Sequence, residues 1–242
     1  MKLPIICMQC AQEQKQQIEG FSFVEIRDDG RYEFTCTNGH QTTTILQQQK
    51  FEILFDIGAY AILDGYYREA VSSFTSSLER FYEFYIKVIT INKKIEEDTF
   101  ISSWKLVSKQ SERQLGAFIF LYTLEHGKTP FLLSPSNVEF RNDVIHKGKI
   151  PTKAEALDYG NDVLKVIRPI LNDLKENYKD SVNKVVFQHL SACRCDNDKD
   201  KPVSTMTVRT ILSLSVYEPG HNELSLEDTM LWLRMMKLQQ KA

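Results

Sequence analysis

Arg141, Asn142 and His146 place a cation, an amide and an imidazole in one short segment of the chain. An arginine guanidinium can bind a phosphate through two parallel hydrogen bonds and stabilise a pentacoordinate transition state. A histidine can move protons near neutral pH, and Asn142 could hold the imidazole or a phosphate oxygen. Because RNA carries its own nucleophile, the 2′-hydroxyl, these groups could cleave it without a metal ion. The expected products are a 2′,3′-cyclic phosphate and a 5′-hydroxyl.

The surrounding sequence predicts a short helix that positions these groups. Ser136-Asn137-Val138-Glu139 has the pattern of a capping box, which opens a helix, and Gly148 and Pro151 close it. On a helical wheel the three polar residues share one broad face, and Val144 on the other side can anchor the helix in a core. His146 falls in the last turn, where the helix dipole favours a cation. The alternative is an ordinary surface cation followed by a histidine that caps the helix.

Hydrophobic periodicity predicts an all-helical bundle of four or five helices over residues 47–180. Thr152 begins a second capping box ahead of a long helix, in which Pro169 is expected to cause a bend. Glu79 and Glu83 could pair with Arg141, although solvated surface carboxylates are the ordinary alternative. Helices are expected at 51–63, from Tyr67, at 101–107, at 114–124 and from Thr152 to Tyr178.

With these surroundings, the segment resembles the R-x(4–6)-H signature of the HEPN (higher eukaryote and prokaryote nucleotide-binding) domains. In their ribonuclease branch the residue after the arginine is typically Asn, Asp or His, and here it is Asn142. The resemblance covers the bundle, and it implies a metal-independent endoribonuclease whose dimer joins two Arg141, Asn142 and His146 sets in a composite active site. Such ribonucleases commonly act as toxins or in antiviral defence. The resemblance therefore also implies an antitoxin or another regulatory partner.

Residues 1–46 are expected to form a small β domain that looks like a zinc ribbon. Cys7 and Cys10 have the spacing of a knuckle, and Cys36 and His40 offer a third thiolate and an imidazole across a turn. Four such ligands suit a structural zinc ion whose coordination is filled by protein. The alternative is three buried cysteines and a surface histidine. Cys193 and Cys195 are too close together for a normal knuckle.

The segments between these ligands alternate apolar and polar residues. Residues 21–26 and 32–35 therefore predict a β-hairpin around the turn residues 28–31. A domain of this size has too little core to fold without a staple such as zinc.

Residues 181–242 predict a mixed C-terminal extension. Residues 195–202 form a charged loop, and residues 203–217 could be a strand, or a helix in a dimer surface. Ser225 to Asp228 can cap a last amphipathic helix that reaches Gln239. The sequence assigns no function to this extension.

Composition describes an ordinary globular protein. The 242 residues carry a formal net charge of -2 and 42% hydrophobic residues, so no basic excess indicates nucleic-acid binding, and any RNA site must be local. No apolar run is long enough to span a membrane, and the start of the chain does not have the pattern of a signal peptide. We therefore expect a cytoplasmic protein with reduced cysteines and no membrane partner. The alternative to the ribonuclease is a non-catalytic adaptor that binds nucleic acid or protein.

Overall fold

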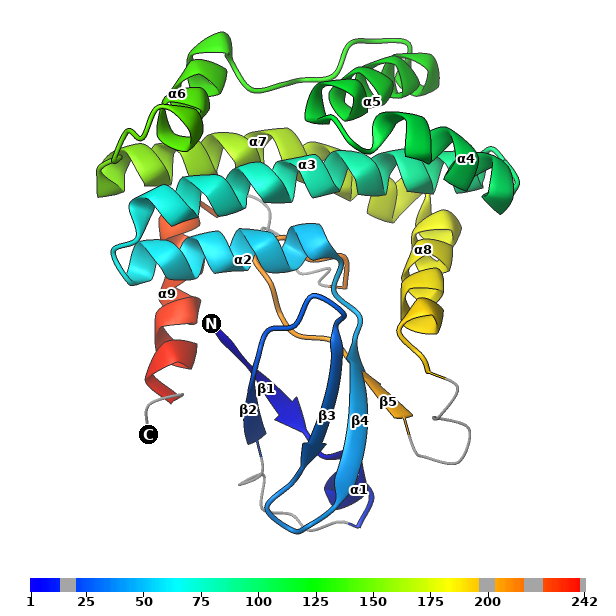
Figure 1. The fold of residues 1–242 in the computed structure, drawn as a ribbon, viewed down its shortest axis with the longest axis vertical. Helices are drawn as coiled ribbons and strands as arrows, with labels where there is room; N and C mark the ends of the chain where they lie inside the picture. Colours follow the sequence, from blue (N-terminus) through cyan, green and yellow to red (C-terminus); the bar gives the residue numbers. More distant parts are fainter. Residues whose placement is uncertain (14–20, 196–202, 216–223, 240–242) are drawn as a thin grey trace.

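The computed structural model describes residues 1–13, 21–195, 203–215 and 224–239. The chain is mostly helical, with a small β region built largely from its N-terminal part (Figure 1). In chain order the elements are β1 (Lys2–Ile6), α1 (Met8–Gln12), β2 (Phe21–Glu25), β3 (Arg31–Thr35), β4 (Gln41–Leu46), α2 (Lys50–Leu63), α3 (Tyr67–Asn92), α4 (Glu97–Val107), α5 (Ser111–His126), α6 (Pro135–His146), α7 (Lys153–Asn177), α8 (Lys179–Ala192), β5 (Val203–Met206) and α9 (Leu226–Gln239).

The β region consists of two small sheets. β1 pairs antiparallel with β2, β3 pairs antiparallel with β4, and β5 adds to β4 in parallel. The predicted hairpin between residues 21–26 and 32–35 is therefore wrong, although both segments are strands. Alternation of apolar and polar residues identifies a strand, but it does not identify the strand with which it pairs. Here Leu3 and Ile5 on β1 are fully buried, and β1 takes the place beside β2 that the hairpin prediction gave to β3.

The helical part is organised around α3 and α7, which run side by side (Figure 1). Helix α2 packs on one side of this pair, while α5 and α6 lie on the other. Phe74 of α3 is at the centre of the core, between two glycines. A Cβ atom on Gly58 would lie 2.6 Å from the Phe74 ring, and one on Gly160 would lie 2.9 Å from it. The body predicted over residues 47–180 is confirmed as mostly helical, but the prediction of four or five helices is wrong, because the structure has six there, α2 to α7. Helix α7 continues through Pro169.

The C-terminal extension contacts both parts of the molecule. Residues 203–217 contain the strand β5 over Val203–Met206, while Val216 and Tyr217 lie outside the described residues, as does most of the charged loop. Farther along, Ile211 and Leu214 donate their backbone N–H groups to Asp56 (3.0 Å) and Glu52 (3.1 Å) on α2. Ser225 caps α9 together with Asp228, as predicted. The extension therefore fastens the β region to the helices.

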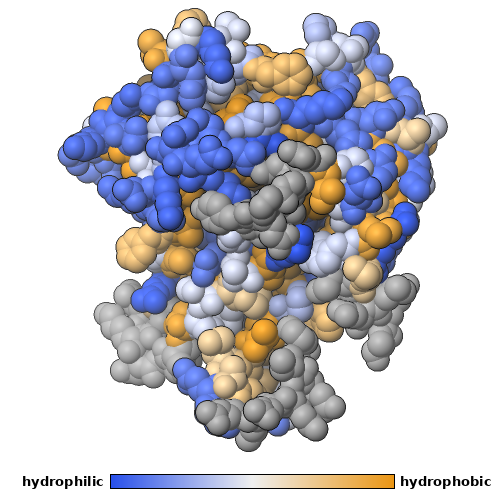
Figure 2. Space-filling view, turned by 180° about the vertical axis from the view of Figure 1, so that it is seen from behind, coloured by the Kyte–Doolittle hydropathy of each residue, from blue (hydrophilic) through white to orange (hydrophobic). Residues whose placement is uncertain are grey.

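The surface of the molecule carries both hydrophilic and hydrophobic residues (Figure 2). Figure 2 shows the face opposite to that of Figure 1, on which hydrophilic residues dominate the helical half and hydrophobic residues are interspersed. No helix in the described ranges combines the length and the apolar character needed to cross a membrane.

Candidate functional site

Helix α6 begins two residues earlier than the sequence pattern indicates. Ser134 is the N-cap, and its hydroxyl accepts a hydrogen bond from the backbone N–H of Asn137 at 3.2 Å. The predicted capping box from Ser136 to Glu139 is therefore wrong. Pro135 occupies the first helical position, where its fixed φ fits and its missing N–H costs nothing. The predicted end is confirmed, because Gly148 has a φ of 76°, in the left-handed region that favours glycine.

The non-polar side of α6 anchors it to the bundle. Val144 is fully buried in the main core, as predicted. The ring of Phe140 lies 5.7 Å from that of Tyr159 on α7, and Asn137 donates a 2.8 Å hydrogen bond to Asp162 on the same helix. The helix is therefore held along its length while its polar side remains accessible.

Arg141, Asn142 and His146 lie along this helix, with the first two half-buried and His146 exposed. Among the residues that the structure describes, no side-chain hydrogen bond or ion pair engages any of the three. Burial raises the pKa of the Tyr159 hydroxyl, and the charge of Arg141 acts in the opposite direction, so the guanidinium is within electrostatic reach of that phenol. All three side chains could therefore contact a ligand without first breaking an intramolecular contact.

The acidic residues near this helix are engaged elsewhere or make no pair with it. Glu83 pairs with Arg80 on its own helix, and Asp143 pairs with Lys147 at 2.8 Å. Within the described part of the chain, neither Glu79 nor Glu83 forms an ion pair with Arg141. Arg141 therefore keeps its charge available for an anion.

The four ligand candidates at the N-terminus form one cluster. Cys7 and Cys10 follow β1, and Cys36 and His40 flank the turn between β3 and β4, where Gly39 has a φ of 81°. Their ligand atoms lie within 4.8 Å of one another. The sequence prediction of these four residues as a single possible metal site is therefore supported by their geometry.

Three separations inside the cluster are close to those that a tetrahedral ion sets, and the others are at most 4.8 Å. The Cys10 sulfur lies 3.6 Å from the Cys36 sulfur and 3.2 Å from Nδ1 of His40, and the Cys7 sulfur lies 3.8 Å from the same nitrogen. A tetrahedral zinc ion, with bonds of about 2.3 Å to sulfur and about 2.0 Å to nitrogen, sets ligand separations of roughly 3.5–3.8 Å. The four residues could hold a metal ion, and they would fill its coordination without leaving a position for a substrate.

Residues around the cluster orient its ligands. Oε1 of Glu13 lies 3.3 Å from Nε2 of His40, which leaves Nδ1 facing the sulfurs. The amide of Asn38 donates to the Cys10 sulfur at 3.3 Å. Burial raises the pKa of the Cys7 thiol, so a cation that favours the thiolate would offset this effect.

The sequence pattern did not predict the roles of three carboxylates, Glu13, Glu52 and Asp56. Glu13 is an unremarkable residue of a polar stretch, and nothing in its spacing marks it as a partner of His40. Glu52 and Asp56, which hold the extension, had a visible signal, because both interrupt the buried side of a helix. Carboxylates at such positions need hydrogen-bond donors from elsewhere in the chain.

Comparison with known proteins gave no relatives: no protein-family model, curated protein or solved structure matches the chain. The resemblance of residues 47–180 to HEPN domains therefore stays a prediction from the sequence.

Proposed function

We propose that the protein is a metal-independent endoribonuclease of the HEPN type, with Arg141, Asn142 and His146 at its active site. The observation that carries this proposal is the absence of side-chain partners for these residues in the described structure, on a helix anchored by Val144. A half-buried arginine that served only the fold would be expected to bind a carboxylate or a carbonyl, and Arg141 does neither in the described structure. These side chains are instead available to a phosphodiester.

Each of the three residues has a role in this mechanism. Arg141 binds the non-bridging oxygens of the scissile phosphate and stabilises the charge of the transition state. His146 takes the proton from the 2′-hydroxyl or gives one to the departing 5′-oxygen. Asn142 positions the imidazole or a phosphate oxygen. The 2′-oxygen forms the new bond to phosphorus as the bond to the 5′-oxygen breaks, which yields the cyclic phosphate and the 5′-hydroxyl.

A dimer would supply the second histidine that this reaction can use. One imidazole must otherwise be recycled between removing and donating a proton, whereas a two-fold axis places another set opposite the first. Exposed apolar side chains on the side of the bundle that carries α5 and α6 support such an interface. Phe120 is 74% exposed, Leu124 82%, Phe131 67% and Ile150 82%. Large apolar side chains at these positions favour burial against a second copy.

The ion proposed for the Cys7, Cys10, Cys36 and His40 cluster is zinc, in a structural role. Three sulfurs and one imidazole nitrogen are its preferred ligands, and a filled coordination shell leaves no catalytic position. Zinc would staple the β region, which could help to bind or select RNA or to position a partner. An RNA-cleaving protein of this kind would act in the cytoplasm as a toxin or a defence effector. Its activity would then need an antitoxin or another regulator.

The deciding experiment incubates the protein with end-labelled RNA in EDTA and maps the product ends. We expect discrete cyclic-phosphate products from the unaltered protein. His146→Ala should reduce cleavage on the order of 10²–10⁴-fold while the fold and RNA binding remain. Arg141→Ala should weaken both binding and rate. Lys128→Ala, which removes an exposed cation from the loop before α6, is the matched control and should cleave normally.

Two results would overturn the proposal. Cleavage by His146→Ala at the normal rate would remove the histidine from the mechanism. RNA binding by the unaltered protein with no cleavage, while circular dichroism shows it folded, would instead favour a non-catalytic adaptor.

A further inference from the structure

A cavity of about 590 Å³ lies where α2, α7 and α9 meet, and neither the proposed active site nor the metal cluster uses it. Its volume is in the range of small-molecule sites, roughly 300–1,000 Å³. The lining residues include four from the end of α2 and the turn that follows it, together with side chains of α9. The C-terminal extension therefore forms one wall of this space.

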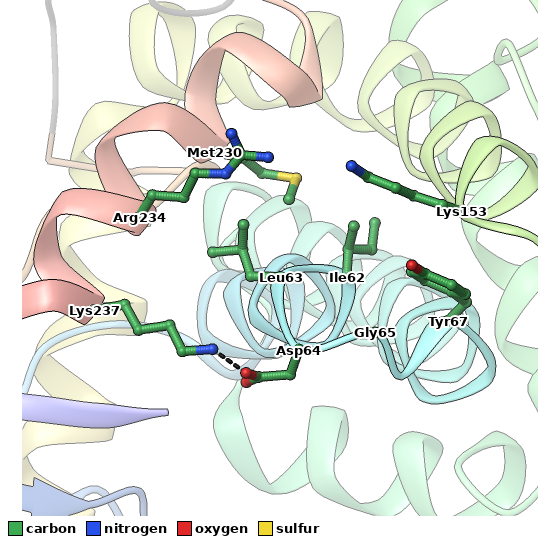
Figure 3. Close-up of a pocket in the computed structure, with 9 residues that line it drawn as sticks. All are labelled: Ile62, Leu63, Asp64, Gly65, Tyr67, Lys153, Met230, Arg234 and Lys237. Carbon is green, nitrogen blue, oxygen red and sulfur yellow. Dashed lines mark hydrogen bonds and ion pairs between the residues drawn. The ribbon is translucent and has the colours of Figure 1, made fainter. Parts of the chain in front are cut away.

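Cations dominate this cavity. Lys153, Arg234 and Lys237 line it, against one carboxylate, Asp64, which is already paired with Lys237. Figure 3 shows Arg234 and Lys153 extending toward the same space from opposite sides, one from α9 and the other from the first residue of α7. In the ranges that the structure covers, no ion pair engages either of them. Two unpaired cations that converge on a cavity are suited to bind a phosphate group.

The floor of the cavity is apolar. Ile62 and Leu63 lie below the two cations in Figure 3, with Met230 beside them and the ring of Tyr67 at one end. Ile62 and Met230 are themselves buried, so phosphate alone would leave the half-buried side chains of Leu63 and Tyr67 without contact. A ligand that combines a phosphate with an apolar or aromatic group would use both parts.

A second cavity adjoins the first, and its lining indicates how a ligand would lie across the two. It measures about 460 Å³ and shares Lys153, Met230 and Arg234 with its neighbour. Its other walls include Leu157, Leu224 and Leu231 as well as two carboxylates. Those carboxylates, Glu227 and Asp228, accept hydrogen bonds from Asn161 and Ser225 and would repel a phosphate. The phosphate is therefore favoured in the first cavity, and an apolar group can extend toward the leucines.

We propose that this cavity binds a small organic phosphate, with Arg234 and Lys153 on the phosphate, Leu63 and Tyr67 beside it, and its apolar part extending toward Leu157 and Leu231. The proposal is independent of RNA cleavage, because none of these residues belongs to the proposed active site. It assigns a role to the C-terminal helix, which provides both Arg234 and Leu231.

The test measures binding by isothermal titration calorimetry with the full chain. Phenyl phosphate and adenosine 5′-monophosphate are the probes, and inorganic phosphate, phenol and adenosine are their separated parts. We expect each organic phosphate to bind at least tenfold more tightly than either of its parts. Lys153→Ala and Arg234→Ala should each weaken binding roughly tenfold or more, as expected for the loss of a charge-assisted phosphate contact.

Controls separate a specific site from general charge. Lys109→Ala removes an exposed lysine between α4 and α5 and should bind both probes normally. Lys153 and Arg234 are themselves exposed, so their variants are expected to fold, which thermal unfolding would verify. Failure of both organic phosphates to bind would overturn the proposal. Equal binding by folded Arg234→Ala and the unaltered protein, or binding of adenosine as tight as that of its phosphate, would also overturn it.

Discussion

The Nε2 atom of His40 lies 3.3 Å from Oε1 of Glu13, which orients the imidazole so that Nδ1 faces the cysteine sulfurs. A carboxylate in this position fixes the ring and increases the basicity of the ligating nitrogen. Removing it should therefore weaken the metal site without removing a ligand.

Glu13→Ala should lower zinc affinity by roughly 10–100-fold. Competition with a chromophoric chelator measures the affinity directly. Gln12→Ala is the matched control, since Gln12 is a neighbouring exposed residue at the end of α1. Equal zinc affinity in the Glu13 and Gln12 variants would show that the carboxylate does not act on the metal.

Loss of a ligand should unfold the β region before the helices. Cys36→Ser removes one thiolate from the cluster, and we expect purified protein to contain less zinc and to exchange the amides of β1 to β4 faster with deuterium. The amides of α3 and α7 should stay protected, because their core is separate from the small core of the β region. Cys195→Ser, which alters an exposed cysteine outside the cluster, is expected to change neither measurement.

The exposed face of α5 provides a test of the dimer. Leu124→Glu places a charge where a second copy would bury an apolar side chain, so the protein should be monomeric in sedimentation experiments and cleave RNA at least tenfold more slowly. The monomer should retain its thermal stability, because Leu124 is 82% exposed in the single chain. Lys105→Glu, which reverses the charge at an exposed position of α4, is the control. A Leu124→Glu protein that remains dimeric would place the interface elsewhere.

Asp56 should make stability depend on pH. Burial raises its pKa to about 8, and the charge of nearby Glu52 acts in the same direction. A carboxyl group whose pKa is higher in the folded protein holds its proton more tightly there, so its contribution to stability is complete below the ordinary pKa of about 4. This contribution is lost as the pH rises toward 8.

Asp56→Asn removes this titration while keeping an oxygen for the N–H of Ile211. As the pH rises from 5 to 9, the free energy of unfolding of the variant should increase by roughly 1–3 kcal/mol relative to that of the unaltered protein. Urea unfolding at each pH measures this difference. Asp158→Asn, at an exposed position of α7, should show no such gain. If the Asp56 and Asp158 variants have the same pH dependence, the Asp56 carboxyl is not the titrating group.

The sequence predicts the features that depend on neighbouring residues. The periodicity of apolar residues indicates the helices, Val144 marks the buried side of α6, and the spacing of Cys7 and Cys10 indicates a metal site. The pattern does not predict which distant strands pair, because the alternation of apolar and polar residues in β2 suits either β1 or β3 as a partner. The cap at Ser134 was missed because Ser136 offers an equally good local pattern.

The cavity beside Arg234 could not be predicted for a related reason. Its walls come from the end of α2, the beginning of α7 and the middle of α9, which are far apart in the chain. Only the packing of the extension brings Lys153 and Arg234 to the same space. Contacts of this type depend on the whole fold, whereas each of the two side chains alone resembles an ordinary surface cation.

The parallel pairing of β4 with β5 has a consequence for the order in which the newly made chain folds. Thr43 lies opposite Val203, so the ribosome must add about 160 residues after β4 before its second partner exists. Domains generally fold from the N-terminus during synthesis, and contacts between distant residues form slowly. The helices from α2 to α8 can therefore assemble first, while one edge of β4 stays open to pairing with other chains. Chains truncated before β5 should therefore aggregate more readily than the full chain.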